Sequence, residues 1–523
     1  MTPLPLLTLL LAVGTSSWGT STGVVGPLLA HETFSHLGGW VRGSITAAYY
    51  VGTLASYLVL GPRLADGCGR RPAVMVGPLL LSIGAVLLSR AHALPLVLGG
   101  RCVIGLGAGL VSSLVPLYAA EVAARESRGK VVAGSHAGFV AGVAAGLWVG
   151  ASFRHRHHHH HHHHHHHLLL LLLLPHQQQQ QQADESWRLI VLLPLLPATL
   201  FIAAFYFWAP ETPRWLAVQA NRPDEAGRVL CWLRGGRQED GNNTTTTTTD
   251  ELHALLEPPD SSDAAAHSVS IRPRLVRAFA LQLIAQLCGA TAAKYYLPQL
   301  LRRLGVPTRA ALVAGAAEMT AKLPMTLLEM WAIDALGRSF CLVAGCLVMA
   351  LALLINGALP LLYPHNSSPA ADAVCVVFIF VYALGYSLGL GPAAWVYSSE
   401  IFPTPLRARG LNWAASGGAL GSLVVSFVWP IGIAHLGSAV YFFFMAFNLA
   451  CVPIIYIFYP ETKGRALEDM DALFANQLPN RPSLPLNSTA IEPGDAPDED
   501  APDEDAPDED APLLPPRARH HRN

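Results

Sequence analysis

The sequence contains few charged residues. Asp, Glu, Lys and Arg make up 13% of its 523 residues, whereas an ordinary soluble domain has about 25%. Hydrophobic residues make up 52%, and the mean hydropathy is +0.36. Because the charges form short patches between long apolar runs, the composition excludes a disordered, fibrous or nucleic-acid-binding protein. It predicts an integral membrane protein.

Cysteine is also sparse. The eight cysteines are scattered and include no Cys-x-x-Cys pair, so neither a disulfide framework nor a zinc site is predicted. The polar segments contain no grouping of residues typical of catalysis. We therefore expect no enzymatic activity, no catalytic residue, no cofactor and no metal site.

Long apolar runs dominate what is present. A membrane-spanning helix needs roughly 20 mostly apolar residues. The first run has no positive residue before it, so we interpret it as a span and not as a secretory signal. Twelve runs qualify: 4–30, 44–62, 72–90, 94–118, 131–152, 187–208, 277–299, 310–333, 339–362, 372–398, 410–435 and 437–459.

Basic residues favour one side of the membrane. Most of them follow even-numbered spans, which places that side and both termini in the cytoplasm. Arg302 and Arg303 lie on the opposite side and weaken this bias without reversing it. The sequon at Asn366 falls in a loop predicted to lie outside.

The spans and polar segments predict a domain organisation. An N-terminal half covers 1–208 and contains a low-complexity insert at 155–182. A polar cytoplasmic loop covers 209–276, a C-terminal half 277–462, and an acidic repetitive tail 463–523. The insert holds eleven consecutive His; imidazole binds transition metals, but we favour a homopolymer expansion.

An internal repeat relates the two halves. Such parallel repeats of six helices, related by an axis along the membrane normal, are typical of alternating-access transporters. The fold class predicted is an all-α membrane protein of twelve helices in two six-helix repeats. Three motifs recur: Asp66-Gly67-Cys68-Gly69-Arg70-Arg71 as Asp334-Ala335-Leu336-Gly337-Arg338-Ser339, the pair Glu121 and Arg128 as Glu400 and Arg407, and Pro210-Glu211-Thr212-Pro213-Arg214 as Pro460-Glu461-Thr462-Lys463-Gly464.

The charges in these motifs predict contacts between the cytoplasmic ends of neighbouring helices. A single exposed ion pair contributes about 0–1 kcal/mol, but six motifs together can bias a conformational equilibrium of a few kcal/mol. We therefore expect them to hold the cytoplasmic side closed in one state, although simple anchoring at the interface is the alternative. The residues concerned are Asp66, Arg70, Arg71, Glu121, Arg128, Glu211, Arg214, Asp334, Arg338, Glu400, Arg407 and Glu461.

With these motifs the chain resembles the sugar porter family of the major facilitator superfamily, and most closely its fungal members. The resemblance runs from Thr22-Gly23-Val24-Val25 to Pro460-Glu461-Thr462-Lys463-Gly464-Arg465 and includes Gly100-Arg101, Gln286-Leu287-Cys288-Gly289 and Gly391-Pro392-Ala393-Ala394-Trp395. It implies a central site between the halves for a hexose or related polyol. It also implies a monomeric carrier in the plasma membrane.

The resemblance implies roles for individual residues. Gln286 would hydrogen-bond sugar hydroxyls, Trp395 would pack against the ring, and Tyr295 and Tyr296 would gate the outer side, although Trp395 could also be ordinary core. Other candidates for substrate binding are His136, Thr291 and Gln282.

The chain departs from the family pattern at several of these positions. His136 stands where the family has a glutamine, Ala285 replaces the first glutamine of a pair, and Thr291 replaces an asparagine. Gly418 and Ser422 occupy positions where asparagines are typical. Each unpaired buried hydroxyl costs roughly 1–3 kcal/mol, so sugar selectivity is expected to differ from ordinary glucose recognition.

The ionisable residues within the spans bear on whether transport is coupled to protons. Ser21 stands where proton-coupled relatives carry an aspartate, which favours facilitated diffusion. His136 and Glu318 are the remaining candidates for a proton carrier. Lys294 or Lys322 would suit an acidic sugar derivative or another organic anion, although a snorkelling Lys and a Glu318–Lys322 pair are structural alternatives.

The leading hypothesis is thus a facilitative transporter of a small carbohydrate across the lipid bilayer. Two alternatives within transport are a proton-coupled symporter and a carrier of a polyol or sugar acid. A non-transporting nutrient sensor is the alternative from another class, although the short, repetitive tail and the motifs present in both halves count against it.

Overall fold

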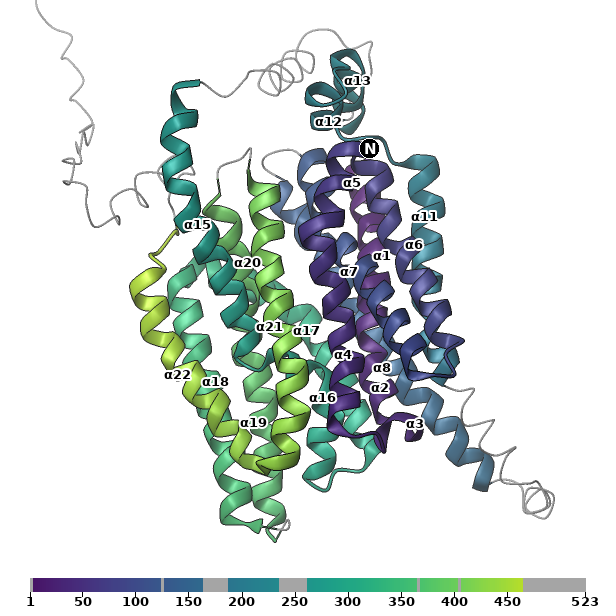
Figure 1. Ribbon diagram of the computed structural model, residues 1–523, viewed down its shortest axis with the longest axis vertical. Coiled ribbons are helices and arrows are strands. Elements are labelled where there is room, and N and C mark those ends of the chain that lie inside the picture. Colours follow the sequence, from purple (N-terminus) through teal and green to yellow (C-terminus); the bar gives the residue numbers. More distant parts are fainter. Residues whose placement is uncertain are drawn as a thin grey trace, which may run out of the picture. The chain divides into compact units, whose positions relative to one another are not determined.

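The computed structural model describes residues 3–123, 127–162, 187–234, 261–364, 367–402 and 406–463, all within the compact unit Met1–Gln477. Over these ranges the chain is a bundle of helices and contains no β-strand (Figure 1). The Thr run of the polar loop, Asn366, the acidic tail and the insert beyond residue 162 lie outside the described residues.

The N-terminal half begins with α1 (Leu4–Gly23), α2 (Val25–Ala30) and the short α3 (Glu32–Ser35). The next span is continuous through α4 (Gly39–Ala55), the π-helical turn η1 (Ser56–Leu60) and α5 (Gly61–Cys68). The remaining helices of this half are α6 (Arg70–Ser89), α7 (Leu94–Val122), α8 (Arg128–His162) and α11 (Leu195–Trp208). Two short helices follow, α12 (Pro213–Val218) and α13 (Pro223–Arg234).

The C-terminal half contains two spans that are broken in the middle. The first is α15 (Ser261–Leu287) with α16 (Ala290–Arg303), and the second is α19 (Pro369–Leu388) with α20 (Leu390–Glu400). The other helices are α17 (Thr308–Leu336), α18 (Arg338–Leu362), α21 (Arg407–His435) and α22 (Val440–Phe458), with a 3₁₀ turn, η3 (Gly437–Ala439), before α22.

All twelve predicted spans are helical. Ten helical segments among the described residues are long and apolar enough to cross a membrane. The other two spans are α1 and α17. The second half of α1 is rich in Ser, Thr and Gly, and these residues are buried against α7, α8 and α11. Because lipid does not contact this surface, α1 needs fewer apolar residues than its neighbours.

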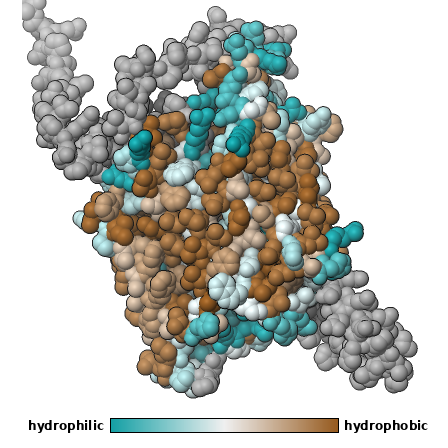
Figure 2. Space-filling view, in the orientation of Figure 1, coloured by the Kyte–Doolittle hydropathy of each residue, from teal (hydrophilic) through white to brown (hydrophobic). Residues whose placement is uncertain are grey.

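The outer surface of the bundle is apolar. In Figure 2 hydrophobic residues dominate the middle of the visible face and hydrophilic residues gather toward its two ends. Large side chains such as Phe207, Leu200 and Ile457 are more than half exposed on this unit. Exposed apolar side chains over the length of a spanning helix are what a bilayer stabilises.

Glycines allow close approach between helices of the N-terminal half. A Cβ atom on Gly105 of α7 would lie 1.9 Å from the carbonyl oxygen of Tyr49 on α4, and one on Gly52 of α4 would lie 2.0 Å from that of Cys102. Small residues at such crossings let backbones pack directly against each other in membranes. The α1–α8 pair is formed in the same way, through Gly19 and Gly142.

The two halves meet along α4 against α21 and along α8 against α17. We call the end of the bundle that carries α12 and α13 the α12 end and the opposite one the α3 end (Figure 1). At the α3 end, hydroxyl contacts join α4 to α16: Thr46 Oγ1 lies 2.9 Å from Tyr296 Oη, and Tyr50 Oη donates to Tyr295 Oη at 3.2 Å. The halves are therefore in direct contact at this end.

Candidate substrate site

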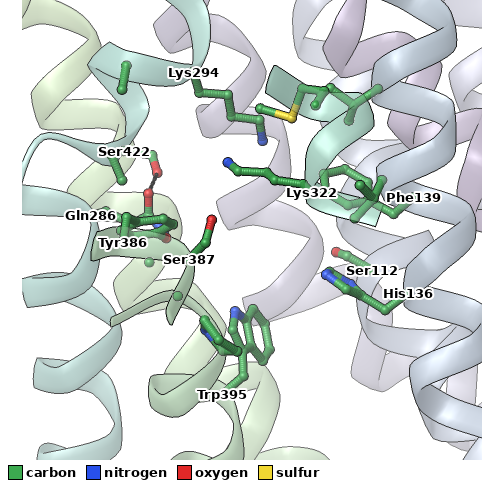
Figure 3. Close-up of a pocket in the computed structure, with 18 of the residues that line it drawn as sticks. Ser112, His136, Phe139, Gln286, Lys294, Lys322, Tyr386, Ser387, Trp395 and Ser422 are labelled. Atoms are coloured by element: carbon green, nitrogen blue, oxygen red, sulfur yellow. Dashed lines mark hydrogen bonds between the residues drawn. The ribbon is translucent and has the colours of Figure 1, made fainter. Parts of the chain in front are cut away.

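A cavity of about 730 Å³ lies between the two halves. Its walls come from α1, α4, α7 and α8 on one side and from helices of the C-terminal half on the other (Figure 3). Its lining includes Lys130, near the start of α8, and Ile333, near the end of α17, so it extends toward the α12 end. The size falls within the roughly 300–1,000 Å³ of small-molecule sites.

A break in the span formed by α15 and α16 shapes one wall. Gly289 has φ +104°, a left-handed conformation that glycine adopts without strain. The carbonyl oxygen of Cys288 accepts hydrogen bonds from Tyr382 Oη at 3.0 Å and from Asn448 Nδ2 at 3.2 Å. Backbone groups freed by a break inside a membrane need such partners. Two side chains from other helices therefore stabilise the break, and Gln286 lies three residues before Gly289.

Gln286 lines the cavity and is held by its neighbours. Its Oε1 accepts from Thr291 Oγ1 and Ser422 Oγ, both at 3.2 Å, and its Nε2 donates to Tyr386 Oη at 3.2 Å. The two small hydroxyl side chains, Thr291 and Ser422, thus fix the amide of Gln286. Gln286 presents an oriented amide to the cavity.

Gln282 lies one helical turn earlier and also lines the cavity. Its side chain is buried, and its Nε2 has no hydrogen-bond partner among the described residues. A buried amide donor without a partner is costly, and a ligand hydroxyl would satisfy it. Gly418 of α21 is adjacent and leaves this part of the cavity open.

Three candidates from the sequence lie behind the cavity wall. Thr291 acts through Gln286, while Tyr295 and Tyr296 form the contacts at the α3 end described above. None of the three belongs to the cavity lining. Their hydroxyls therefore support the wall and the contact between halves.

Aromatic side chains flank the cavity. Trp395 of α20 lines it and is 42% exposed, although most large aromatics of the core are buried (Figure 3). On the opposite wall, Trp18 stacks on Phe139 at 3.9 Å between ring centroids, and the ring of His136 lies 5.5 Å from Phe139. The cavity thus offers flat apolar faces on both sides.

Several residues that line the cavity were not predicted to bind substrate. Tyr386, Ser387 and Ser112 supply hydroxyls, and Trp18 and Tyr49 supply rings. Trp18 Nε1 donates to Tyr49 Oη at 2.9 Å, which joins α1 to α4. A Ser or Tyr in an apolar span gives no signal of its own, because only the packing of helices determines which face meets the cavity.

The charge motifs form a compact group in the N-terminal half. Arg70 Nε lies 3.3 Å from Glu121 Oε2, and Thr212 Oγ1 donates to the same oxygen at 2.7 Å. Glu211 accepts from the backbone N–H groups of Arg70 and Arg71 at 3.0 and 3.1 Å. These N–H groups begin α6, so the carboxylate caps that helix.

The C-terminal half repeats this group. Arg338 Nη2 lies 2.7 Å from Glu400 Oε1, and Thr462 Oγ1 donates to Glu400 Oε2 at 2.6 Å. Glu461 accepts from the backbone N–H groups of Arg338 and Ser339 at 2.9 Å. Each of the two groups thus joins three helix ends inside one half.

Glycine makes these caps possible. Gly69 and Gly337 precede α6 and α18 with φ of +94° and +99°. A Cβ atom there would lie 2.5 Å from Glu211 Oε2 or 2.6 Å from Glu461 Oε2. Both motifs therefore require glycine before the arginine, because the carboxylate of Glu211 or Glu461 occupies the space that a side chain would need.

The two capping carboxylates differ electrostatically. Burial raises the pKa of Glu211 above its usual value, against the lowering effect of hydrogen bonds from Thr212, Arg71 and Arg70. Burial also acts to raise the pKa of Glu461, but backbone N–H donors, now including that of Lys463, outweigh it and lower the pKa. The C-terminal cap thus favours the ionised form.

One ion pair of the α12 end joins the two halves. Arg409 Nη2 lies 3.0 Å from Asp66 Oδ2, and Asp66 is also 3.7 Å from Arg70. Arg409 was not among the predicted motif residues, although it stands two positions after Arg407.

The remaining motif residues lie elsewhere: Arg71 contacts Tyr206, and Arg214 lies in α12. The side chains of Arg128, Asp334 and Arg407 lie outside the described residues.

Residues 31–474 match the model of the family described as Sugar (and other) transporter. The chain belongs to this family. Similar curated proteins include the glucose transporter GlcP of Staphylococcus epidermidis (28% identity, covering 89% of this chain and 96% of that protein) and the major myo-inositol transporter IolT of Bacillus subtilis (27%, 87% and 91%). The MFS glucose transporter mfs1 of Aspergillus flavus is similarly related (26%, 88% and 86%), so fungal and bacterial relatives match about equally.

Solved structures show the same fold. The inward open form of the xylose transporter XylE from E. coli superimposes with a TM-score of 0.69 at 22% identity, covering 90% of this sugar transporter family member and 99% of XylE. The proton:xylose symporter XylE bound to 6-bromo-6-deoxy-D-glucose gives 0.70 at 22%, with the same coverage. The predicted fold, two six-helix repeats of the major facilitator superfamily in a multi-pass membrane protein, is confirmed.

Proposed function

We propose that this family member carries a hexose or a related polyol across the membrane by alternating access. The observation that carries the proposal is the cavity between the halves, which is lined by the oriented amide of Gln286, by the ring of Trp395 and by Gln282, whose Nε2 has no partner among the described residues. Sugars present hydroxyls and flat C–H surfaces, and amides and aromatic faces bind these two features. Relatives named as glucose and myo-inositol transporters support this substrate class.

The contacts between halves support the transport mechanism. The α3 end is joined by the Tyr295 and Tyr296 hydroxyls, while the cavity extends toward the α12 end. Basic residues are concentrated after even-numbered spans, and α12 follows the sixth span, so this distribution assigns the α12 end to the cytoplasm. We therefore place this conformation as the one facing inward, with both termini cytoplasmic, and we propose the plasma membrane as its location.

We also propose facilitated diffusion. Ser21, at the position where proton-coupled relatives carry an aspartate, is buried and donates to the carbonyl oxygen of Trp18 at 2.7 Å. A serine hydroxyl does not ionise in the accessible pH range, so Ser21 cannot take the place of a titrating aspartate. His136 and Glu318, the other candidate proton carriers, line the cavity.

Uptake by purified protein in proteoliposomes tests the proposal. Radiolabelled D-glucose, D-xylose and myo-inositol are supplied with and without an inward proton gradient. Saturable uptake that ignores the gradient is expected. Uptake that follows the gradient would contradict facilitated diffusion, and the absence of any saturable uptake would contradict the transport of these sugars.

Two tryptophans provide a matched pair of variants. Trp395→Ala removes an aromatic face from the cavity, and we expect the KM for the transported sugar to rise about tenfold. Trp413 is similarly exposed, at 41%, but lies outside the cavity lining and donates to the carbonyl oxygen of Leu275. Trp413→Ala should leave the KM within about twofold.

A further inference from the structure

Cationic side chains are concentrated in the cavity. The sequence contains four lysines and thirty arginines, so arginine is the usual cation of this chain. Three of the four lysines, Lys130, Lys294 and Lys322, line the cavity. Glu318 is the one carboxylate among the described lining residues. The cavity therefore carries more positive than negative groups.

The positions of Lys294 and Lys322 are specific. Lys294 extends from α16 and Lys322 from α17, and their ammonium ends point toward one another across the cavity (Figure 3). Lys322 Nζ lies 3.0 Å from Glu318 Oε1, so its charge is paired. No carboxylate of the described residues lies within ion-pair distance of Lys294.

Aromatic contacts stabilise the Lys294 ammonium only in part. Its Nζ lies 5.3 Å from the ring centroid of Phe139 and 5.4 Å from that of Tyr295. Such contacts hold the ammonium in place between the two halves without neutralising it. Two converging ammonium groups beside a single carboxylate leave one positive charge without a counterion. A bound anion would supply that counterion.

We propose that the preferred substrate carries a carboxylate on its polyhydroxylated skeleton, as a sugar acid does, and that Lys294 and Lys322 bind this carboxylate. The inference rests on the proposed function and narrows its substrate class. The polyol part would contact Gln282, Gln286 and Trp395, and the carboxylate would lie between the two ammonium groups. The amides that the family pattern has and this chain lacks would matter less for such a substrate, because the charge supplies much of the recognition.

Competition uptake in proteoliposomes tests this inference. The probes are D-glucuronate and D-glucose, which differ at a single carbon, with D-glucosamine as the cationic counterpart. We expect unlabelled D-glucuronate to inhibit the uptake of radiolabelled D-glucose at least tenfold more strongly than unlabelled D-glucose does. D-Glucosamine should inhibit this uptake least. Uptake of D-glucose with no advantage for D-glucuronate would overturn the inference and leave the proposed function intact.

Removing a positive charge from the cavity should lower the glucuronate-to-glucose preference, and removing the negative charge should raise it. Lys294→Met and Lys322→Met should reduce the glucuronate-to-glucose preference to within about twofold. Glu318→Gln keeps a hydrogen-bonding group near Lys322 but removes the competing charge, so it should increase the preference. Lys463→Met changes the one lysine outside the cavity, whose Nζ donates to the carbonyl oxygen of Ala335, and should leave the preference unchanged.

Thermal stabilisation of the purified protein by each compound separates failure of transport from failure of binding. Stabilisation by D-glucuronate that is lost in Lys294→Met would support the inference even without measurable uptake. Stabilisation that is equal in the wild type and Lys294→Met would overturn it. No stabilisation by either compound, together with no uptake, would overturn the proposed function as well.

Discussion

Gly418 leaves space in the cavity beside Gln282. A Cβ atom there would lie 3.6 Å from Gln282 Oε1, an ordinary van der Waals distance. A side chain with a Cβ atom is therefore accommodated, and an asparagine would add a hydrogen-bonding amide beside Gln282. We expect Gly418→Asn to lower the KM for a neutral hexose about fivefold to tenfold, which corresponds to about 1–1.4 kcal/mol for one hydrogen bond.

Gly418→Ala is the control for this variant, because it adds the Cβ atom without the amide. Its KM should stay close to that of the wild type in the same proteoliposome assay. An equal gain in both variants would show that filled space, and not the amide, causes the effect.

Glu211 and Glu461 should respond differently to pH. The lowered pKa of Glu461 means that its ionised form stabilises the fold at pH 7, and that this stabilisation is lost as the pH falls below about 4.5. The raised pKa of Glu211 means that the fold gains stability as the pH falls from 7 through that pKa. Glu461→Gln should therefore lower the Tm at pH 7 more than Glu211→Gln does.

Melting curves in detergent between pH 7 and 4 measure both effects. The Tm difference between wild type and Glu211→Gln should grow in favour of the wild type as the pH falls. The difference for Glu461→Gln should shrink only below about pH 4.5. The same pH response in both variants would contradict the opposite pKa directions.

At the scale of helices, Gly105 and Gly99 of α7 form a natural comparison. A Cβ atom on Gly105 would overlap the backbone of α4 at Tyr49, whereas Gly99 has nothing within 4 Å. Gly105→Ala should destabilise the protein by about 1–3 kcal/mol through forced separation of the helices. Gly99→Ala should be neutral or slightly stabilising, because alanine favours helix more than glycine does.

Urea unfolding of both variants in the same detergent measures the difference. Equal stabilities for the two variants would show that α4 and α7 can separate without cost. In that event the direct backbone contact would not hold these two helices together.

The helices themselves could be predicted because lipid imposes a length and a composition on each of them. Span ends could not be predicted as well: α15 begins at Ser261, well before the apolar run at 277, because a helix continues beyond the membrane wherever its backbone bonds remain favourable. The break at Gly289 gave no apolar signal either. It depends on partners from other helices, Tyr382 and Asn448, that only the folded bundle brings to it.

At the scale of the whole molecule, the tyrosine hydroxyls at the α3 end should set the balance between conformations. Tyr295→Phe with Tyr296→Phe removes the bonds to Tyr50 and Thr46 that join the halves. At about 1 kcal/mol for each bond, the equilibrium should shift roughly thirtyfold toward opening at this end.

A cysteine replacing Leu297, which lines the cavity, would report this opening through its reaction with a membrane-impermeant maleimide. Among the native cysteines only Cys68 is exposed, and it lies toward the α12 end. Tyr459→Phe removes a comparable bond within the C-terminal half, to the carbonyl oxygen of Arg277, and should not change the labelling rate. Unchanged labelling in the double variant would show that these hydroxyls do not control opening.

The site could be predicted only where a side chain has a strong chemical signature. Gln286, Gln282, Trp395 and His136, which were predicted to bind substrate, line the cavity. Among the described residues, Arg70 pairs with Glu121 and Arg338 with Glu400 inside their own halves, whereas Asp66 pairs with Arg409 across the halves. A repeat in sequence shows that two sites are alike and cannot show which side chains meet across the interface.

The distribution of lysines has a practical consequence. Amine-reactive reagents modify lysine and leave arginine intact, so three of the four lysine targets in this chain line the cavity. Mass spectrometry of Lys130, Lys294 and Lys322, with Lys463 as the internal reference, would then record how far the path is open from either side of a membrane. The wild-type protein thus contains its own chemical reporters of the transport cycle, and no label needs to be introduced to read them.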